Sequence, residues 1–157
     1  MIQGKLLSYG DDLSEAYLIR RKVFLEEHGI PEGLEFDGRD DMAIHVTVYE
    51  GANNKIPVAT GRICFDGSSC EIGHIAVLKE YRRKKYGDFT VRMLMNKAFT
   101  AGLHKVECIV PAGIIEFFKT IGFTIVGDEF TLNERTCYRM QISDRGVIKA
   151  CKGNLNH

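Results

Sequence analysis

The stretch IGHIAVLKEYRRKKYGDFTVRMLM, which runs from Ile72 to Met95, decides the fold that this sequence predicts. It starts in a short apolar strand pattern, passes through a turn with four consecutive cations, and ends in a helical pattern. The apolar stripe of that helix consists of Val91, Leu94, Met95 and Ala98. A strand that enters a helix through a glycine-containing turn is suited to phosphates, because the free N–H groups and the dipole of the helix start attract anions.

The four cations of this turn are Arg82, Arg83, Lys84 and Lys85, and we call residues 82–85 the basic turn. The whole chain has 21 basic and 21 acidic residues, so the cations are not needed for solubility and any anion site is local. A solvated turn is the alternative on charge alone. The spacing fits neither a dinucleotide-binding nor a P-loop motif. No aromatic platform or second basic stripe accompanies the turn, so nucleic acid is not an expected partner.

Length and composition favour a single domain over residues 1–157, with a core at about 3–143. Of the residues, 45% are hydrophobic and 27% are charged, which argues against disorder. Five cysteines without a C-x-x-C spacing favour reduced thiols in a cytoplasmic protein. Neither a signal pattern nor a membrane-spanning apolar run is present in the sequence, so no membrane partner is expected. His45 has no ligand at a diagnostic spacing, and we predict no metal.

The rest of the chain alternates between the two periodicities of secondary structure. Strand patterns cover residues 5–8, 43–50, 56–66, 70–78, 104–111, 123–130 and 136–143. Helical patterns cover residues 11–29, 87–98 and 112–122, and the acidic segment 31–41 is a loop or a short second helix. We expect residues 144–157 to fray. The order β-α-α-β-β-β-α-β-α-β-β predicts an α/β (α+β) domain with a mixed, mostly antiparallel sheet and helices on both faces.

Three segments resemble the GNAT acyltransferases, and the resemblance extends from about Ile19 to Met140. Val77, Arg82 and Gly87 match the acetyl-coenzyme A motif V-x-x-x-x-[RQ]-x-x-G-x-[GA]. FFKTIGF, residues 117–123, is similar to the later signature FYEKLGF. IRRKVFLEEHGIPEGLEFDGRDD, residues 19–41, is similar to the ElaA- or YjcF-like bacterial branch.

The resemblance implies that acetyl-coenzyme A (acetyl-CoA) is the co-substrate, with its pyrophosphate held by main-chain amides of the turn. The residues that it assigns to the cofactor are Ile75, Ala76, Val77, Arg82, Arg83, Lys84, Lys85, Tyr86, Gly87, Asp88 and Phe118. A backbone N–H near Ala76 or Val77 would polarise the thioester carbonyl. Two residues depart from the motif: Lys85 stands at its first glycine, and the carboxylate of Asp88 would repel a pyrophosphate that it faced.

The resemblance also implies a catalytic base at Glu71, six residues before Val77, where histone-type members carry Glu and arylalkylamine-type members carry His. By strand alternation, residues 71, 73, 75 and 77 share one face. His74 is a competitor by residue type. Because alternation turns it to the other face, a hydrogen-bonded structural histidine is the expectation there.

The expected proton donor is missing, because Phe118 stands where the family has Tyr and a phenyl ring donates no proton. Water, Tyr138 or Tyr86 are candidates for this role by type only. Cys108 lies in the strand 104–111, where we expect a buried small side chain rather than an acyl carrier. The acidic residues Glu35, Asp37, Asp40 and Asp41 would attract a cationic amine or form a solvated loop.

The leading hypothesis is an acetyl-CoA-dependent N-acetyltransferase that acts on a small primary amine by direct transfer in a ternary complex. Phe118 favours an alternative, a non-catalytic acyl-CoA-binding regulator. RRKVF and LEFDGRDD also resemble the start of the acyl-homoserine lactone synthases, although this chain has no Trp. Pairing of two chains through the C-terminal hairpin is a candidate homodimer.

Overall fold

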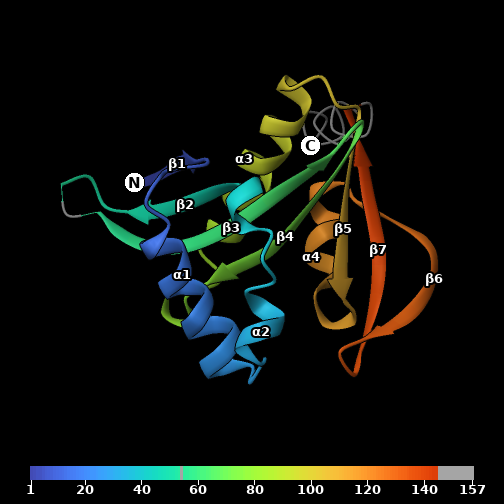
Figure 1. Cartoon of the computed structure of the whole chain (residues 1–157), viewed down its shortest axis with the longest axis horizontal. Helices are drawn as coiled ribbons and strands as arrows, with labels where there is room; N and C mark the ends of the chain where they lie inside the picture. Colours follow the sequence, from blue (N-terminus) through green and yellow to red (C-terminus); the bar gives the residue numbers. More distant parts are fainter. Residues whose placement is uncertain (54, 145–157) are drawn as a thin grey trace. The chain divides into compact units, whose positions relative to one another are not determined.

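A computed structural model describes residues 1–53 and 55–144 of the chain, and its elements can be followed in Figure 1. The strands are β1 (Ile2–Leu7), β2 (Ile44–Glu50), β3 (Ile56–Asp66), β4 (Ser69–Val77), β5 (Lys105–Pro111), β6 (Thr124–Leu132) and β7 (Arg135–Ser143). The α-helices are α1 (Ser14–Arg20), α2 (Glu32–Glu35), α3 (Tyr86–Thr100) and α4 (Ile115–Ile121). A π-helical segment, Arg21–Glu27, extends α1, and 3-10 turns lie at Asp40–Met42, Lys79–Tyr81 and Ala112–Ile114.

The seven strands follow one another in the sheet in the order β1-β2-β3-β4-β5-β7-β6. The pairs β1/β2, β2/β3, β5/β7 and β6/β7 are antiparallel. The predicted fold, a mixed sheet flanked by helices, is confirmed, and so are the hairpins β2/β3 and β6/β7. The chain divides into two compact units that share β4, the first made of residues 1–65 and 72–97 and the second of 66–71 and 98–157.

In the first unit, α1 and α3 cover opposite faces of the strands. Ala76 of β4 packs in a buried cluster with Ile19 and Val23 of the α1 segment. Its neighbour Ile75 lies on the other face, where a Cβ atom added to Gly61 would stand 3.2 Å from Ile75 and 2.9 Å from Leu94 of α3. Gly61 is therefore small because α3 crosses β3 closely at this point.

The second unit contains β5, β7 and β6, together with α4 and the turn that precedes it. The buried side chains of this unit include Val106, Cys108, Val110, Phe118, Ile121, Phe123, Met140 and Ile142. β6 lies at the end of the strand order and exposes Ile125, Val126 and Leu132. This is the hairpin predicted to pair in a homodimer, which stays a prediction.

Two elements differ in an informative way from the sequence prediction. The first strand covers Ile2–Leu7 rather than residues 5–8, because its pairing with β2 begins at Ile2. The predicted helix 11–29 is α-helical only to Arg20, and the π-helical segment that follows ends at Glu27. Apart from Asp144, the predicted frayed end 144–157 lies outside the described residues. In the described part of the chain, no helix combines the length and apolar character that crossing a bilayer requires.

Candidate functional site

The basic turn has a backbone that glycine would adopt more readily. Arg83 has φ 65° and Lys85 has φ 69°, both in the left-handed region. Lys85 is the residue at the motif's first glycine, so the chain keeps the conformation of a glycine loop with a side chain in place. The side chains of Arg83, Lys84 and Lys85 are exposed. α3 begins directly after this turn, at Tyr86, and its first N–H groups have no partner within the helix.

Arg82 is anchored within the protein. Its Nε donates to the carbonyl oxygen of Val77 at 3.0 Å, and its two Nη atoms each donate to a carboxylate oxygen of Glu27 at 2.6 Å. This bidentate pair lowers the pKa of Glu27 and raises the pKa of Arg82. Arg82 thus joins the end of β4 to the π-helical segment, and its guanidinium fixes the path of the turn.

The helix start is also held by its own side chains. Asp88 accepts a hydrogen bond from Nε of Arg92 at 2.8 Å, so its carboxylate is paired with a cation of the same helix. Tyr86 is buried, and burial together with a hydrogen bond to Glu50 raises the pKa of its hydroxyl. Lys84 lies over the ring of Tyr81, with 5.6 Å between its Nζ atom and the ring centroid.

β4 contains an irregularity at His74. This residue has φ 51°, a left-handed conformation that a regular strand does not contain. Alternation of faces along residues 71–77 requires extended backbone throughout. Because His74 is not extended, alternation does not place Glu71 on the same face as Ile75 and Val77. The side chain of His74 is 20% exposed, and its Nδ1 lies 2.7 Å from Oε1 of Glu35. His74 is therefore hydrogen-bonded, as we expected.

A buried ionic network surrounds this histidine, and Arg20 is at its centre. Nε of Arg20 donates to Oε1 of Glu35 at 2.8 Å, and Nη1 donates to Oδ1 of Asp40 at 2.8 Å. Nη2 donates to the backbone oxygen of Glu35 at 2.9 Å. The guanidinium also faces the ring of Phe36, 4.7 Å from its centroid. Arg20 is 1% exposed, and every one of these contacts is made away from solvent.

Arg62 of β3 forms the second half of the network. Its Nη1 donates to Asp37 at 2.8 Å and to Asp40 at 2.9 Å, and Nη2 donates to Asp37 at 2.6 Å. The hydrogen bonds from Arg62 hold the pKa of Asp37 well below its usual range. Burial opposes ionisation of Asp40, but hydrogen bonds from Arg20 and Arg62 lower its pKa. The solvated-loop interpretation is wrong for Glu35 and Asp40, which are buried and paired with guanidinium groups. Asp37 is paired with Arg62 but remains exposed at the edge of the network.

His45 lies beneath this network. Its Nε2 is 2.9 Å from the backbone oxygen of Asp40, and burial lowers its pKa. Nδ1 of His45 has no hydrogen-bond partner in the described part of the chain. Neutral imidazole with its proton on Nε2 accounts for both observations. Among residues 1–53 and 55–144, no group of three or more His, Cys, Asp or Glu side chains is placed to hold a metal ion.

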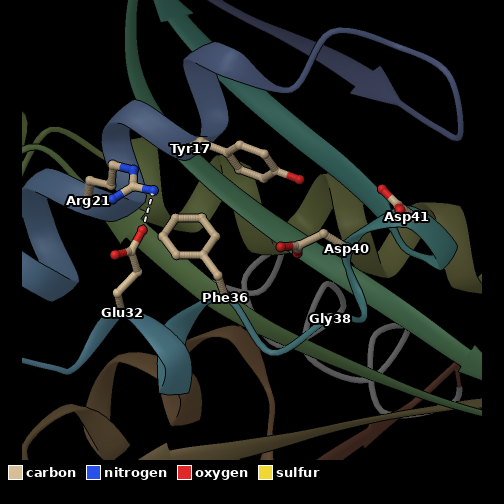
Figure 2. Close-up of a pocket in the computed structure, with 7 residues that line it drawn as sticks. All are labelled: Tyr17, Arg21, Glu32, Phe36, Gly38, Asp40 and Asp41. Atoms are coloured by element: carbon tan, nitrogen blue, oxygen red, sulfur yellow. Dashed lines mark hydrogen bonds and ion pairs between the residues drawn. The ribbon is translucent and has the colours of Figure 1, made fainter.

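A hollow of about 350 Å³ adjoins the network. Its lining residues are Tyr17, Arg21, Glu32, Phe36, Gly38, Asp40 and Asp41 (Figure 2). Arg21 stacks on Phe36 and donates to Glu32 at 2.6 Å. Figure 2 shows the hydroxyl of Tyr17 on the side of Asp40 and Asp41. The hollow thus has aromatic walls and an exposed carboxylate at Asp41. The ring of Phe36 is already faced by the guanidinium groups of Arg20 and Arg21.

The predicted base Glu71 lies in the second unit, in a cluster with Arg139 and Glu107. Nη1 of Arg139 is 3.8 Å from Oε2 of Glu71 and 3.4 Å from Oε2 of Glu107. Burial, reinforced by the charge of Glu71, raises the pKa of Cys108, so the thiol is held protonated. That protonation agrees with the small buried side chain that we expected rather than an acyl carrier.

Phe118, at the position of the family's acid, and the candidate acid Tyr138 have different surroundings. Phe118 is 3% exposed and packs edge-on against Phe117 and Phe123, with centroids 5.1 and 5.3 Å away. Its ring has little surface left for a cofactor, and its predicted role there stays a prediction. The hydroxyl of Tyr138 donates to Glu129 at 2.9 Å, and this hydrogen bond raises its pKa.

Sequence reasoning missed the network as a unit, although one signal for it is in the sequence. Arg20 falls on the same face of the first helix as Ala16 and Val23, because residues four and three positions apart are neighbours on a helix. An arginine in an apolar stripe needs acidic partners. The acidic segment 31–41 supplies them, but only the fold shows which of its carboxylates turn inward.

The model of the acetyltransferase (GNAT) family matches residues 12–123, and this chain belongs to that family. It is 33% identical to the uncharacterized protein YyaT of Bacillus subtilis over 122 residues, which cover 76% of this chain and 80% of YyaT.

Many solved structures share the fold. ElaA of Escherichia coli has a TM-score of 0.78 at 21% identity, with coverage of 90% of this chain and 99% of ElaA. The CoA-dependent acyl-homoserine lactone synthase BjaI, solved with SAM and isopentyl-CoA, has a TM-score of 0.76 at 15% identity, with coverage of 97% and 89%. The resemblance to the GNAT enzymes is therefore confirmed, and the chain is an N-acetyltransferase by family. It shares its fold with ElaA.

Proposed function

We propose that this chain transfers the acetyl group of acetyl-CoA to a small primary amine, by direct attack of the amine within a ternary complex. The observation that carries the proposal is the conformation of the basic turn. Two non-glycine residues, Arg83 and Lys85, hold left-handed backbone directly before a 15-residue helix. Such strain persists where the surrounding structure imposes it, and it is concentrated at binding sites.

The cofactor's pyrophosphate would bind at the start of α3. The amides of Tyr86, Gly87 and Asp88 have no partner within the helix, and the helix dipole favours an anion there. Arg82 would act through position rather than contact, since its guanidinium is held by Val77 and Glu27. The exposed Arg83, Lys84 and Lys85 would supply the positive field. Ile75, Ala76 and Val77 would bind the thioester through their main chain.

Negative charge in the first unit supports an amine as acceptor. Three carboxylates in the network, on Glu35, Asp37 and Asp40, face two guanidinium groups, which leaves one negative charge while the histidines are neutral. A cationic amine would be attracted to the exposed part of this network. Asp41, at the rim of the hollow, adds to the same field.

The proposal is tested by titrating the chain with acetyl-CoA in a calorimeter and by measuring free thiol during turnover. The amines would be glucosamine, spermidine, a set of amino acids and a tripeptide with a free N-terminus. We expect saturable binding in the micromolar range and thiol release that depends on one of the amines. Absence of saturable binding contradicts the proposal.

Two alternatives are distinguished by the same assay. Burial of Phe118 at the position of the family's tyrosine favours a non-catalytic acyl-CoA-binding regulator, which would give binding without thiol release. The second alternative is a synthase-like enzyme. Arg20 of RRKVF binds Glu35 and Asp40 of LEFDGRDD, so the two segments that resemble the synthases lie together. We would therefore test SAM as acceptor, because BjaI was solved with SAM. Thiol release with SAM and a longer acyl-CoA would indicate a synthase-like reaction.

A further inference from the structure

The two ring nitrogens of His74 have different environments. Nδ1 lies 2.7 Å from Oε1 of Glu35 and 3.5 Å from Nη2 of Arg20. Nε2 lies 3.8 Å from Oδ2 of Asp37, beyond hydrogen-bonding distance. One nitrogen is therefore bound inside the network, and the other faces its exposed edge.

These contacts select a tautomer. Glu35 is held by the guanidinium of Arg20, and an ionised carboxylate only accepts hydrogen bonds. A contact of 2.7 Å between Nδ1 and this carboxylate requires the proton to be on Nδ1. The lone pair of the neutral ring is then on Nε2, the nitrogen that no described residue occupies with a hydrogen bond. A carboxylate that orients an imidazole in this way leaves the other nitrogen ready to accept a proton.

His74 is also one of the two network residues that reach solvent. Its side chain is 20% exposed and that of Asp37 is 31% exposed, whereas Arg20, Glu35, Asp40 and Arg62 are buried. Asp37 is a poor base, because Arg62 donates to both of its oxygens. It keeps its charge, which would attract the ammonium group of an acceptor towards Nε2 of His74.

The backbone places this imidazole beside the predicted thioester site. His74 directly precedes Ile75, Ala76 and Val77 on β4, the main-chain segment assigned to the thioester. Its left-handed φ of 51° is unfavourable for a residue other than glycine, so the surrounding contacts hold it there. The edge of Phe24 packs against the ring, with centroids 6.3 Å apart, and limits its rotation.

We propose that His74 is the general base of the acetyl transfer and that Glu35 is its positioning residue. This inference rests on the proposed function and replaces Glu71 in that role. Glu35 accepts the proton of Nδ1 in a hydrogen bond, is itself fixed by Arg20, and thereby directs Nε2 towards the acceptor.

The acceptor arrives as an ammonium ion and loses one proton to solvent. As its nitrogen forms a bond to the carbonyl carbon, a second proton passes from nitrogen to Nε2 of His74. The carbon–sulfur bond breaks, the electron pair goes to sulfur, and the coenzyme A thiolate takes a proton from solvent. His74 then releases its proton to solvent, and no oxidant, metal or further reactant is needed.

His74→Asn is the decisive variant. Asparagine adopts left-handed backbone more readily than most residues, and its amide N–H can replace the Nδ1 donor to Glu35. Only the basic Nε2 is lost. We expect kcat with acetyl-CoA and the best amine of the panel to fall about a hundredfold or more, while the Kd for acetyl-CoA stays within about threefold of wild type. The matched control is His104→Asn, since His104 also pairs with a carboxylate, Asp144 at 2.9 Å, but is 85% exposed.

Glu35→Gln tests the positioning role. Nitrogen-15 spectra of the wild-type imidazole should show His74 with its proton on Nδ1 and an unprotonated Nε2. In Glu35→Gln we expect the proton to distribute over both nitrogens, with kcat lowered about tenfold and KM changed little. Reduced stability alone would not alter the tautomer of folded protein.

The possible results distinguish a wrong assignment of the base from a wrong assignment of the reaction. If His74→Asn turns over at the wild-type rate, the role of His74 is overturned. The same holds if Glu71→Gln loses turnover while His74→Asn keeps it. In both cases the proposed N-acetyltransferase activity still stands. A wild-type spectrum with the proton on Nε2 overturns the role of His74 as well, whether or not an acceptor has been found. A chain that binds acetyl-CoA but acetylates no amine contradicts the proposed function, and with it the base.

Discussion

Nε of Arg20 lies 2.8 Å from Oε1 of Glu35, and the two side chains are 1% and 5% exposed. Breaking a buried ion pair by removal of one partner leaves a charge without compensation, which costs about 3–5 kcal/mol. Arg20→Met would leave both Glu35 and Asp40 without this partner. We therefore expect its free energy of unfolding in urea to fall by about 3–5 kcal/mol.

The control for this prediction is the next residue. Arg21→Met removes an ion pair of similar length, 2.6 Å to Glu32, but these side chains are 47% and 61% exposed. Exposed pairs contribute about 0–1 kcal/mol. Equal losses in the two variants would show that burial of the Arg20 network does not determine its contribution to stability.

The left-handed backbone of Lys85 gives a second prediction. A non-glycine residue in this conformation costs about 1–2 kcal/mol, which Lys85→Gly would relieve and Lys85→Ala would not. Glycine loses about 0.5–1 kcal/mol more conformational entropy on folding. We therefore expect Lys85→Gly to be more stable than Lys85→Ala in urea unfolding and to bind acetyl-CoA at least as tightly. Lys84, which is not in the left-handed region, provides the control pair Lys84→Gly and Lys84→Ala, where the order of stability should reverse.

The anchoring of Arg82 by Glu27 gives a prediction with an unusual sign. Glu27→Gln removes a negative charge from the region of a polyanionic cofactor, and simple electrostatics would tighten binding. We expect the opposite, a Kd for acetyl-CoA raised about threefold to tenfold, because the variant loses charge-assisted hydrogen bonds that hold the turn. Glu26→Gln makes the same change of charge one residue earlier and should not weaken binding. Calorimetric titration of both variants decides between the two effects, and tighter binding by Glu27→Gln contradicts the anchoring role.

Phe118 gives a prediction about the missing acid. Phe118 is 3% exposed, and restoring the family's tyrosine by Phe118→Tyr would place a hydroxyl in its packed aromatic cluster. A buried hydroxyl without a partner costs about 1–3 kcal/mol. We expect the variant to unfold at lower urea concentration and to show no increase in kcat. A gain in kcat at unchanged stability would show that this position faces the reacting groups.

The sequence predicted the basic turn because its parts are adjacent in the chain. A strand end, four cations, a glycine and an apolar helical stripe all lie between Ile72 and Ala98, so local rules were sufficient there. The same locality explains the correct hairpins. What the sequence could not show is how Arg82 is used, since its partner Glu27 is 55 residues away.

The network around Arg20 was missed for a related reason. Its members come from four segments. Its three carboxylates lie in an acidic stretch whose composition is also typical of a solvated loop. Alternation along β4 separated Glu71 from His74, but the left-handed backbone at His74 is a single-residue feature that no periodicity reveals. The choice of base therefore depended on the fold.

The burial of His45 gives a prediction about acid stability. Its pKa in the folded chain is lowered, mainly by burial, so below pH about 6.5 the unfolded chain binds a proton that the folded chain does not. Stability should therefore fall with decreasing pH, by at most about 1.4 kcal/mol per pH unit for one proton. Near pH 4 a second loss begins, because the lowered pKa values of Asp37 and Asp40 stabilise the folded chain only while the unfolded carboxyls are ionised. The free energy of unfolding of His45→Gln, measured in urea between pH 7.5 and 5, should decrease less with falling pH than that of the wild type. An unchanged dependence of stability on pH in His45→Gln would show that this buried imidazole does not cause the first loss.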